Sequence, residues 1–299
     1  MIARQALDPS FFVSLTVITT LLSGCQSNPL ASQSPRSSLR VSLTFHASFD
    51  GSADASYALG DRRIYTAPSF SKRDAAQPGL NASNIVVLAK GQGRFGDAIW
   101  FNQKPAPLVF FKAAKNMSYR TNNWSGTVSF WLNADPVELA PGFCDPIQIT
   151  PRAWNDACFF VEFEKREQVP FRLGVYADYK VWNPGNRRWD DISFVEKPLL
   201  GATGQAFGRA RWTHVVFTFD RFNTGRPDGV AKLYLDGVYQ GVLSPRVQTF
   251  TWDPSKTLVM LGASYIGLLD ELSLFNRALT PEEVLALNQL PAGIPGLLQ

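Results

Sequence analysis

The sequence contains little histidine and little cysteine, with two His and three Cys among 299 residues. His46 and His214 are far from each other and from the cysteines, so a zinc site made of His and Cys is not expected. Charge is also sparse, with 18% charged residues and a net charge of +4. Because Lys and Arg are scattered and form no basic run, we expect no nucleic acid partner.

Helical periodicity, repeats and common catalytic motifs are absent as well. No helical pattern of useful length precedes Pro281, and the lack of an internal repeat argues against a propeller. A Ser-His-Asp order, a phosphate loop and a haem Cys motif are also missing. Aromatic residues are what the chain has in abundance, with 22 Phe and 8 Trp, and such side chains favour strands.

Apolar and polar residues alternate along most of the chain with the period of two that is typical of half-buried strands. The run from Val41 to Asp50 is the clearest case, and Asp236-Gly237 is a strong signal for a hairpin turn. Similar alternation recurs within residues 127–133, 159–163, 171–175, 212–220 and 231–235. Many strands separated by Gly, Pro, Asn and Asp clusters predict an antiparallel sandwich or barrel.

The N-terminus has the features of an export signal. Arg4 precedes an apolar run from Phe11 to Leu22, which is too short to span a bilayer comfortably. Ser23-Gly24-Cys25 resembles a bacterial lipobox, which implies a signal peptide over residues 1–24 and lipidation of Cys25. Gln26 after the cysteine suggests the outer membrane by the same resemblance. An ordinary secretory signal with an incidental Cys, or an uncleaved anchor, is the alternative.

Residues 25–40 are predicted to be a flexible tether, because they are rich in Ser, Gln, Asn and Pro and can bury little apolar surface. No domain boundary is visible from there to Leu290, so residues 41–290 form one predicted domain and residues 291–299 a tail. Exported proteins meet an oxidising compartment, so Cys144 and Cys158 are predicted to form a disulfide. Two separately buried thiols are the alternative.

Four segments occur in a specific order and spacing. The last of them contains a capping box, in which Thr280 and Glu283 exchange bonds at a helix start that carries Pro281. The segments are Ser125–Leu132, Trp212–Phe219, Lys232–Val238 and Gly267–Leu287. Together they resemble LamG-like domains of the concanavalin A-like lectin/glucanase superfamily, over about Leu43 to Leu287. The resemblance implies an all-β fold, an antiparallel two-sheet jelly-roll sandwich with a concave face and a short C-terminal helix.

The resemblance also implies a structural Ca²⁺ ion at the rim of the sandwich. Asp50 and Asp270 are the matching positions, and Ca²⁺ prefers such carboxylate oxygens. The alternatives are a turn residue for Asp50 and a side chain that bonds backbone amides for Asp270. No other cofactor is expected.

One aromatic-rich loop has the composition of a sugar site. It contains Tyr176, Tyr179, Trp182 and Trp189, with Asp190 beside the last of these. Exposed aromatic rings stack on the apolar faces of sugars, while carboxylates bond to sugar hydroxyls. The alternative is core packing, since Tyr and Trp are often buried with their polar tips satisfied.

A catalytic pattern is also present in an imperfect form. Some glucanases of this superfamily carry Glu-x-Asp-x-x-Glu on a concave-face strand, and Glu162 to Glu167 has this spacing with Glu164 in the middle. Lys165-Arg166 favours a solvated strand end instead. We therefore predict a non-catalytic, membrane-anchored extracytoplasmic module that binds carbohydrate. The alternatives are a protein–protein or structural module of the cell envelope, and a glycoside hydrolase using Glu162 and Glu167.

Overall fold

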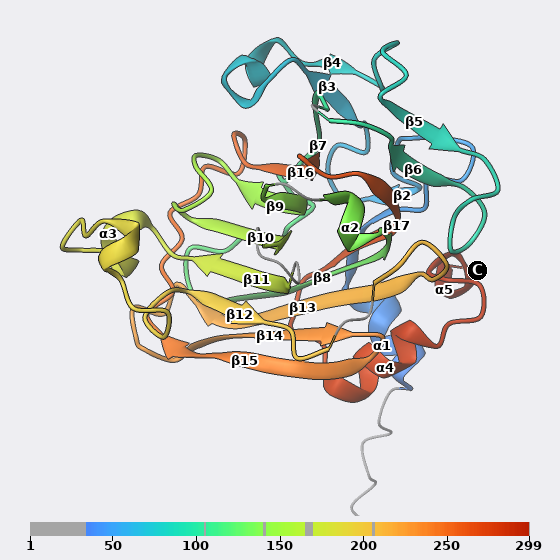
Figure 1. Ribbon diagram of the computed structural model, residues 1–299. Helices are drawn as coiled ribbons and strands as arrows, with labels where there is room; N and C mark the ends of the chain where they lie inside the picture. The colour runs from blue at the N-terminus through green and yellow to red at the C-terminus, as the bar shows by residue number, and fades with distance from the viewer. Residues whose placement is uncertain (1–33, 105, 140–141, 165–169, 205–206, 299) are drawn as a thin grey trace, which may run out of the picture. The chain divides into compact units, whose positions relative to one another are not determined.

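The computed structural model describes residues 34–104, 106–139, 142–164, 170–204 and 207–298, which form two stacked antiparallel sheets (Figure 1). The first, sheet A, has nine strands within this part of the chain. Across the sheet they are β15 (Val238–Arg246), β14 (Gly229–Leu235), β13 (Thr213–Phe222), β8 (Trp124–Asn133), β17 (Gly267–Phe275), β1 (Leu43–Ala47) and β2 (Tyr57–Ala58), with β6 (Ala98–Phe101) on β17 and β5 (Val86–Ala89) on β6.

The second sheet, sheet B, has eight strands in the same described ranges. In order they are β12 (Leu199–Gly201), β11 (Phe171–Tyr176), β10 (Cys158–Phe163), β9 (Cys144–Thr150), β16 (Leu258–Ala263), β7 (Leu108–Lys112), β3 (Tyr65–Ala67) and β4 (Gln77–Pro78). The two sheets are antiparallel throughout their ladders, so the predicted jelly-roll sandwich is confirmed.

The core lies between the sheets and is built from alternate residues of each strand. Phe130 and Val215 face it from sheet A, and Phe159 and Val161 face it from sheet B. The residues between them face outward, because successive side chains of a strand point to opposite sides. The alternation seen in the sequence therefore separates the core from two outer faces, one on each sheet.

Three helices cover the outer face of sheet A. They are α1 (Pro35–Ser42), α4 (Pro281–Asn288) and α5 (Pro295–Leu298). Leu39 of α1 and Val284 of α4 are fully buried in a second apolar cluster with Val216 and Tyr234 of the sheet. The capping box of α4 is formed as predicted, since the Thr280 amide donates to Glu283 Oε2 at 2.9 Å and the Glu283 amide to Thr280 Oγ1 at 3.3 Å.

The described residues also form four short helical segments in the connections between strands. These are η1 (Phe70–Ala75), α2 (Pro136–Leu139), α3 (Tyr179–Trp182) and η2 (Trp189–Asp191). No helix in the described ranges is long and apolar enough to cross a membrane.

Both predicted ends of the domain need correction. Residues 35–40, assigned to the tether, belong to α1, where Arg277 Nη2 donates to Ser38 Oγ at 2.6 Å. Residues 291–298, assigned to a tail, include buried Ile294 and Leu297. Each segment folds onto the domain because α4 and sheet A offer its apolar residues a surface on which to pack. The predicted signal peptide, Cys25 and the tether up to residue 33 lie outside the described residues.

The predicted disulfide between Cys144 and Cys158 is wrong, because both thiols are buried and free. Cys144 pairs with Phe163 at one end of β10, whereas Cys158 begins the other end of that strand. Five residues of strand separate these points by about 17 Å, and a disulfide needs Cα atoms within about 7 Å. The thiols also face opposite sides of sheet B, Cys144 in the core and Cys158 in an outer cluster.

Candidate functional site

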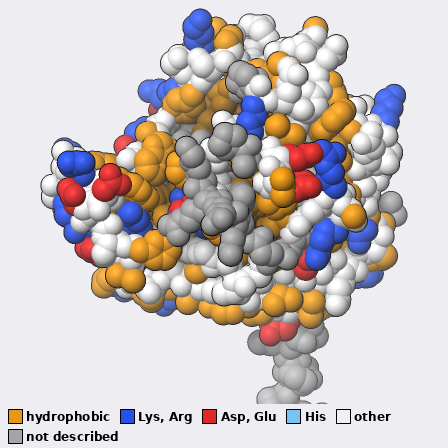
Figure 2. Space-filling view, in the orientation of Figure 1, with side chains coloured by type: hydrophobic (Ala, Val, Ile, Leu, Met, Phe, Trp, Pro, Cys, Tyr) orange, Lys and Arg blue, Asp and Glu red, His pale blue; other side chains and the backbone are white. Residues whose placement is uncertain are grey.

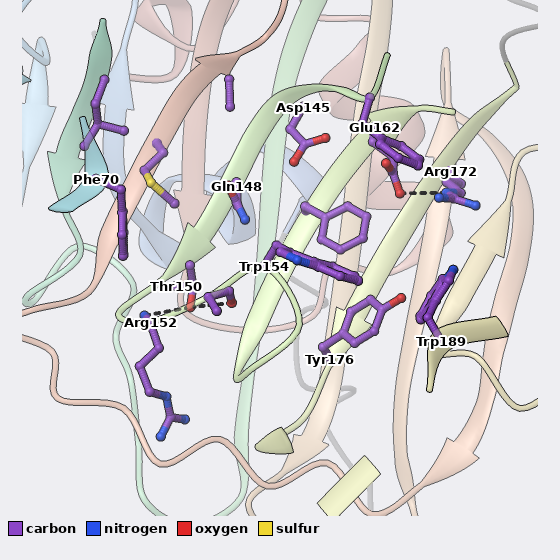
Figure 3. A pocket seen from close by; sticks show the side chains of 16 residues that line it. Phe70, Asp145, Gln148, Thr150, Arg152, Trp154, Glu162, Arg172, Tyr176 and Trp189 are labelled. Atoms are coloured by element: carbon purple, nitrogen blue, oxygen red, sulfur yellow. Dashed lines mark hydrogen bonds and ion pairs between the residues drawn. The ribbon is translucent and has the colours of Figure 1, made fainter. Parts of the chain in front are cut away.

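A pocket of about 810 Å³ opens on the outer face of sheet B (Figure 3). Its floor is made by outward-facing residues of β9, β10, β11 and β16, and its walls by η1, η2 and the loop between β9 and β10. The residues that line it are Phe70, Leu108, Phe143, Asp145, Gln148, Thr150, Arg152, Ala153, Trp154, Phe160, Glu162, Arg172, Tyr176, Trp189, Met260 and Ala263.

Three charged residues occupy the floor, one on each of three neighbouring strands. Asp145 lies on β9, Glu162 on β10 and Arg172 on β11, and they follow one another in Figure 3. Glu162 and Arg172 are direct cross-strand partners, with Arg172 Nε 2.7 Å from Glu162 Oε1. Arg172 Nη1 also lies 2.9 Å from Glu164 Oε1. One guanidinium therefore holds two carboxylates, that of Glu162 on β10 and that of Glu164 just after the strand.

Burial raises the pKa of both carboxyl groups that line the pocket. It raises the pKa of Glu162, although Arg172 acts in the opposite direction. It raises the pKa of Asp145 well above the usual value, and the negative charge of Glu162 adds to this effect. Asp145 Oδ1 is buried and has no hydrogen-bond partner among the described residues. Asp145 thus has one carboxylate oxygen that accepts no hydrogen bond from the described residues.

An aromatic wall stands beside this floor. Trp154 is 46% exposed, and its ring centroid lies 5.6 Å from that of Tyr176 and 5.6 Å from that of Trp189. The loop that carries Trp154 is held by Thr150 Oγ1, which donates to the carbonyl groups of Ala153 and Asp156. The wall is therefore a cluster of rings that leaves part of Trp154 open to a ligand.

Gly174 allows the ring of Phe160 to lie flat on β11 next to this wall. A Cβ atom at Gly174 would be 2.2 Å from the Phe160 ring. Phe160 in turn stacks on Tyr176, with ring centroids 5.5 Å apart. The absence of a side chain at Gly174 therefore sets the depth of the pocket floor.

Two of the five predicted sugar-contact residues line the pocket, namely Tyr176 and Trp189. Tyr179 and Trp182 lie behind the wall, where Tyr179 Oη bonds Asn186 Oδ1 at 2.8 Å and Trp182 Nε1 donates to the Asn155 carbonyl at 2.8 Å. Asp190 is exposed on η2 and is not part of the lining.

Sequence reasoning missed Asp145, Gln148, Trp154 and Arg172. The alternation of β9 and β11 holds a signal for two of these residues, Gln148 and Arg172, since they occupy the register opposite to the core positions Ile147 and Leu173. Asp145 shares the register of Ile147 and lines the pocket because the pairing of β9 with β10 is irregular between Val161 and Phe163. Trp154 gives no such signal, because it lies in a loop. Glu162, which the sequence analysis named as a catalytic residue of the alternative hydrolase, does line the pocket. Glu167 lies outside the described residues.

The two predicted calcium ligands both accept hydrogen bonds from one loop, residues 93–97. Asp270 Oδ2 accepts from the amides of Arg94 at 2.7 Å and Phe95 at 3.1 Å, and Asp50 Oδ1 accepts from the amide of Asp97 at 2.8 Å. Burial, together with the adjacent Glu271, raises the pKa of Asp270 to about 8. Asp270 thus accepts hydrogen bonds from backbone amides, which is the role that the sequence analysis gave as the alternative to a metal ligand.

The donor set for calcium is partly in place. Two carboxylates meet at the loop, and oxygen is the donor that Ca²⁺ prefers. The described residues contain no group of three or more His, Cys, Asp or Glu that could hold a metal ion. Any further ligands would have to be backbone carbonyls or water. Calcium at this loop stays a prediction.

Charges of both signs are interspersed over the face of the protein that Figure 2 shows. Two stacked antiparallel sheets with an aromatic-walled pocket on one outer face define a lectin-type jelly roll. A sequence profile described as the concanavalin A-like lectin/glucanases superfamily matches residues 111–285, and the chain belongs to that superfamily.

Several solved structures resemble this chain, and the first of them supports the fold. Domain 4 of AbnA, a GH43 extracellular arabinanase from Geobacillus stearothermophilus, in complex with arabinotriose, is 18% identical, with a TM-score of 0.51 over 83% of this chain and 98% of that chain. The botulinum neurotoxin type G receptor binding domain is 10% identical (TM-score 0.49, 83% and 51%). A Trypanosoma rangeli sialidase is 14% identical (TM-score 0.48, 85% and 33%). No curated protein sequence matches.

Proposed function

We propose that this protein is a non-catalytic module that binds a carbohydrate in the pocket on sheet B. The observation that carries the proposal is the half-exposed ring of Trp154 beside the polar floor of Asp145, Gln148 and Glu162. A ring of this kind stacks on the apolar face of a sugar, and the floor groups bond its hydroxyls. The volume of about 810 Å³ falls within the range of pockets that hold small ligands. The arabinotriose bound by the arabinanase domain gives further support.

The geometry of the floor favours binding over hydrolysis. A glycosidase needs two carboxyl groups that are free to exchange protons with the substrate or attack it. Arg172 instead bonds both Glu162 and Glu164. A hydrolase that uses Glu162 and Glu167 is the alternative that the binding experiment below also tests.

We further propose that the module is exported and attached to the outer membrane through a lipid on Cys25. The described part of the chain begins at α1, which packs on the outer face of sheet A. The pocket lies on the outer face of the other sheet. An anchor that precedes α1 would therefore leave the pocket on the side of the domain opposite to the attachment point. Fractionation of cells that produce the protein with Cys25→Ala tests this, and an unchanged membrane fraction would contradict it.

Isothermal titration calorimetry with the purified protein tests the proposed function. The probes are arabino-, xylo-, cello- and chito-oligosaccharides of equal length. We expect at least one to bind, and Trp154→Ala to weaken it about tenfold. This corresponds to about 1.4 kcal/mol, within the range of about 0.5–1.5 kcal/mol for an aromatic stacking contact. Trp100→Ala is the matched control, because Trp100 is 39% exposed but lies on β6 of sheet A.

Three outcomes would overturn the proposal. The first is no binding of any saccharide, which together with envelope proteins that co-purify would favour a protein–protein module. The second is an equal loss of affinity in both Trp variants, which would move the site away from the pocket. The third is a rise of new reducing ends during incubation, which would favour the hydrolase.

A further inference from the structure

The charges at the pocket floor are not balanced among the described residues. Both guanidinium groups that line the pocket are bound to carboxylates other than Asp145. Arg172 bonds Glu162 and Glu164. Arg152 bonds Asp178 Oδ1 at 2.6 Å and lies 3.2 Å from Asp156 Oδ2.

Asp145 has no cation of its own on the neighbouring strands either. On one side it pairs with Ala263 of β16, and on the other β10 presents the carboxylate of Glu162. Lys104 is near in space, but its Nζ donates to Cys144 Sγ at 2.9 Å and to the Leu139 carbonyl at 2.9 Å. The charge of Arg172 also acts on Asp145 and lowers its pKa, but the guanidinium of Arg172 is bonded to Glu162 and Glu164. The thiols of Cys144 and Cys158, which also interact with Asp145, supply no positive charge. A buried carboxylate without a partner is costly unless it is protonated or meets a cation.

The aromatic wall is also suited to a positive charge. Lys197 Nζ already lies 4.2 Å from the centroid of the Trp189 ring. The exposed part of Trp154 presents the same kind of surface in the pocket that Asp145 also lines, and indole is the ring that attracts cations best. The floor and the wall therefore favour the same charge on a ligand.

We propose that the saccharide bound in this pocket carries a free, protonated amino group, which binds between Asp145 and Glu162 while the sugar ring lies on Trp154. This inference rests on the proposed function. An ammonium group has three N–H donors, which match the carboxylates of Asp145 and Glu162 and the side-chain oxygen of Gln148. An N-acetylated amine has one N–H donor and no charge, so it fits this floor less well.

Calorimetry with matched pairs of oligosaccharides tests the inference. Glucosamine and galactosamine oligomers are each compared with their fully N-acetylated counterparts of equal length, at a pH where the free amines are protonated. We expect at least a tenfold preference for the free amine in one pair. Asp145→Asn should weaken the binding of the free amine at least fivefold more than that of the N-acetylated sugar, so that the preference falls to within about twofold. Thermal unfolding verifies that the variant is folded.

Asp191→Asn is the matched control, because it removes a carboxylate that is exposed on η2, outside the pocket lining. It should keep the tenfold preference. Equal binding of both members of each pair would overturn the inference and leave the proposed function standing. An equal loss of both ligands in Asp145→Asn would overturn it as well, since the amine would then have no special contact. No binding of any saccharide would overturn the proposed function and the inference together.

Discussion

Arg172 Nε lies 2.7 Å from Glu162 Oε1, and the two residues face each other across β10 and β11. Both side chains are almost fully buried, at 9% and 6% exposure. The pair sits in the floor of the pocket, so the same contact that joins two strands also sets the charge that a ligand meets. Its removal should therefore affect stability and binding together.

Replacement of Arg172 by Met should lower the free energy of unfolding by about 3–5 kcal/mol, because Glu162 and Glu164 would lose their shared cation while still buried. The double variant with Glu162→Gln should recover part of this loss. Urea unfolding measures both. Arg187→Met is the control, since its pair with Glu196 is 44% and 47% exposed, and solvent screening should leave it little effect on stability. Equal losses for Arg172 and Arg187 would contradict the expectation.

Replacement of Gly174 by Ala should destabilise the protein by about 1–3 kcal/mol, because its Cβ would overlap the ring of Phe160 and force a shift in the pocket floor. The binding of saccharide should weaken as well. Gly201→Ala on the neighbouring strand is the matched control, as no heavy atom lies within 4 Å of its Cβ position. If both variants unfold at the same urea concentration, the position of the Phe160 ring does not require a glycine at residue 174.

Reductant should leave the thermal midpoint unchanged, because Cys144 and Cys158 are free thiols. A disulfide that closes a loop of about 15 residues would contribute roughly 3 kcal/mol, which corresponds to about 6–12 °C for a chain of this size. Alkylation without prior reduction, followed by mass spectrometry, should find both cysteines modified in the denatured protein. A peptide pair joined through these two residues would show that the disulfide forms after all.

Stability should fall as the pH drops below about 6.5, in part because of His214. His214 is 1% exposed, and burial lowers its pKa to about 3. Between about pH 6.5 and 3 the unfolded chain takes up a proton that the folded protein excludes. This costs up to about 1.4 kcal/mol per pH unit. His214→Gln, which can still bond Ser129, should show a shallower loss in urea titrations from pH 7 to pH 4. Parallel curves of stability against pH for the wild type and the variant would mean that His214 is not the cause of this loss.

Calcium should raise the thermal midpoint of the protein if Asp50 and Asp270 hold the ion at the loop of residues 93–97. At a concentration one hundred times Kd the gain would be about 2.7 kcal/mol. Asp270→Asn should lower the midpoint and also abolish the difference between samples with calcium and with chelator. Calorimetry gives both values. A wild-type midpoint that is the same with and without chelator would rule out the ion.

The sequence predicts local features of the fold well where neighbours in the chain supply the physical cause. The capping box at Thr280 needs only residues three positions apart, and it forms as expected. Phe159 and Val161 face the core because they alternate with Phe160 and Glu162 along one strand. The disulfide and the tether could not be predicted in this way, since each depends on a partner that is distant in the chain.

The candidate site shows the same division. Tyr176 and Trp189 could be named from the composition of their loop, and Glu162 from its spacing. The pairing of β9, β10 and β11 brings Asp145, Glu162 and Arg172 to one floor, and no local pattern indicates which strands are neighbours. By itself, therefore, the sequence determined the class of fold, because strand alternation and caps are short-range. Only the tertiary structure decided where the pocket lies and which of its carboxylates has no ion pair among the described residues, because strand order and ion pairs are long-range.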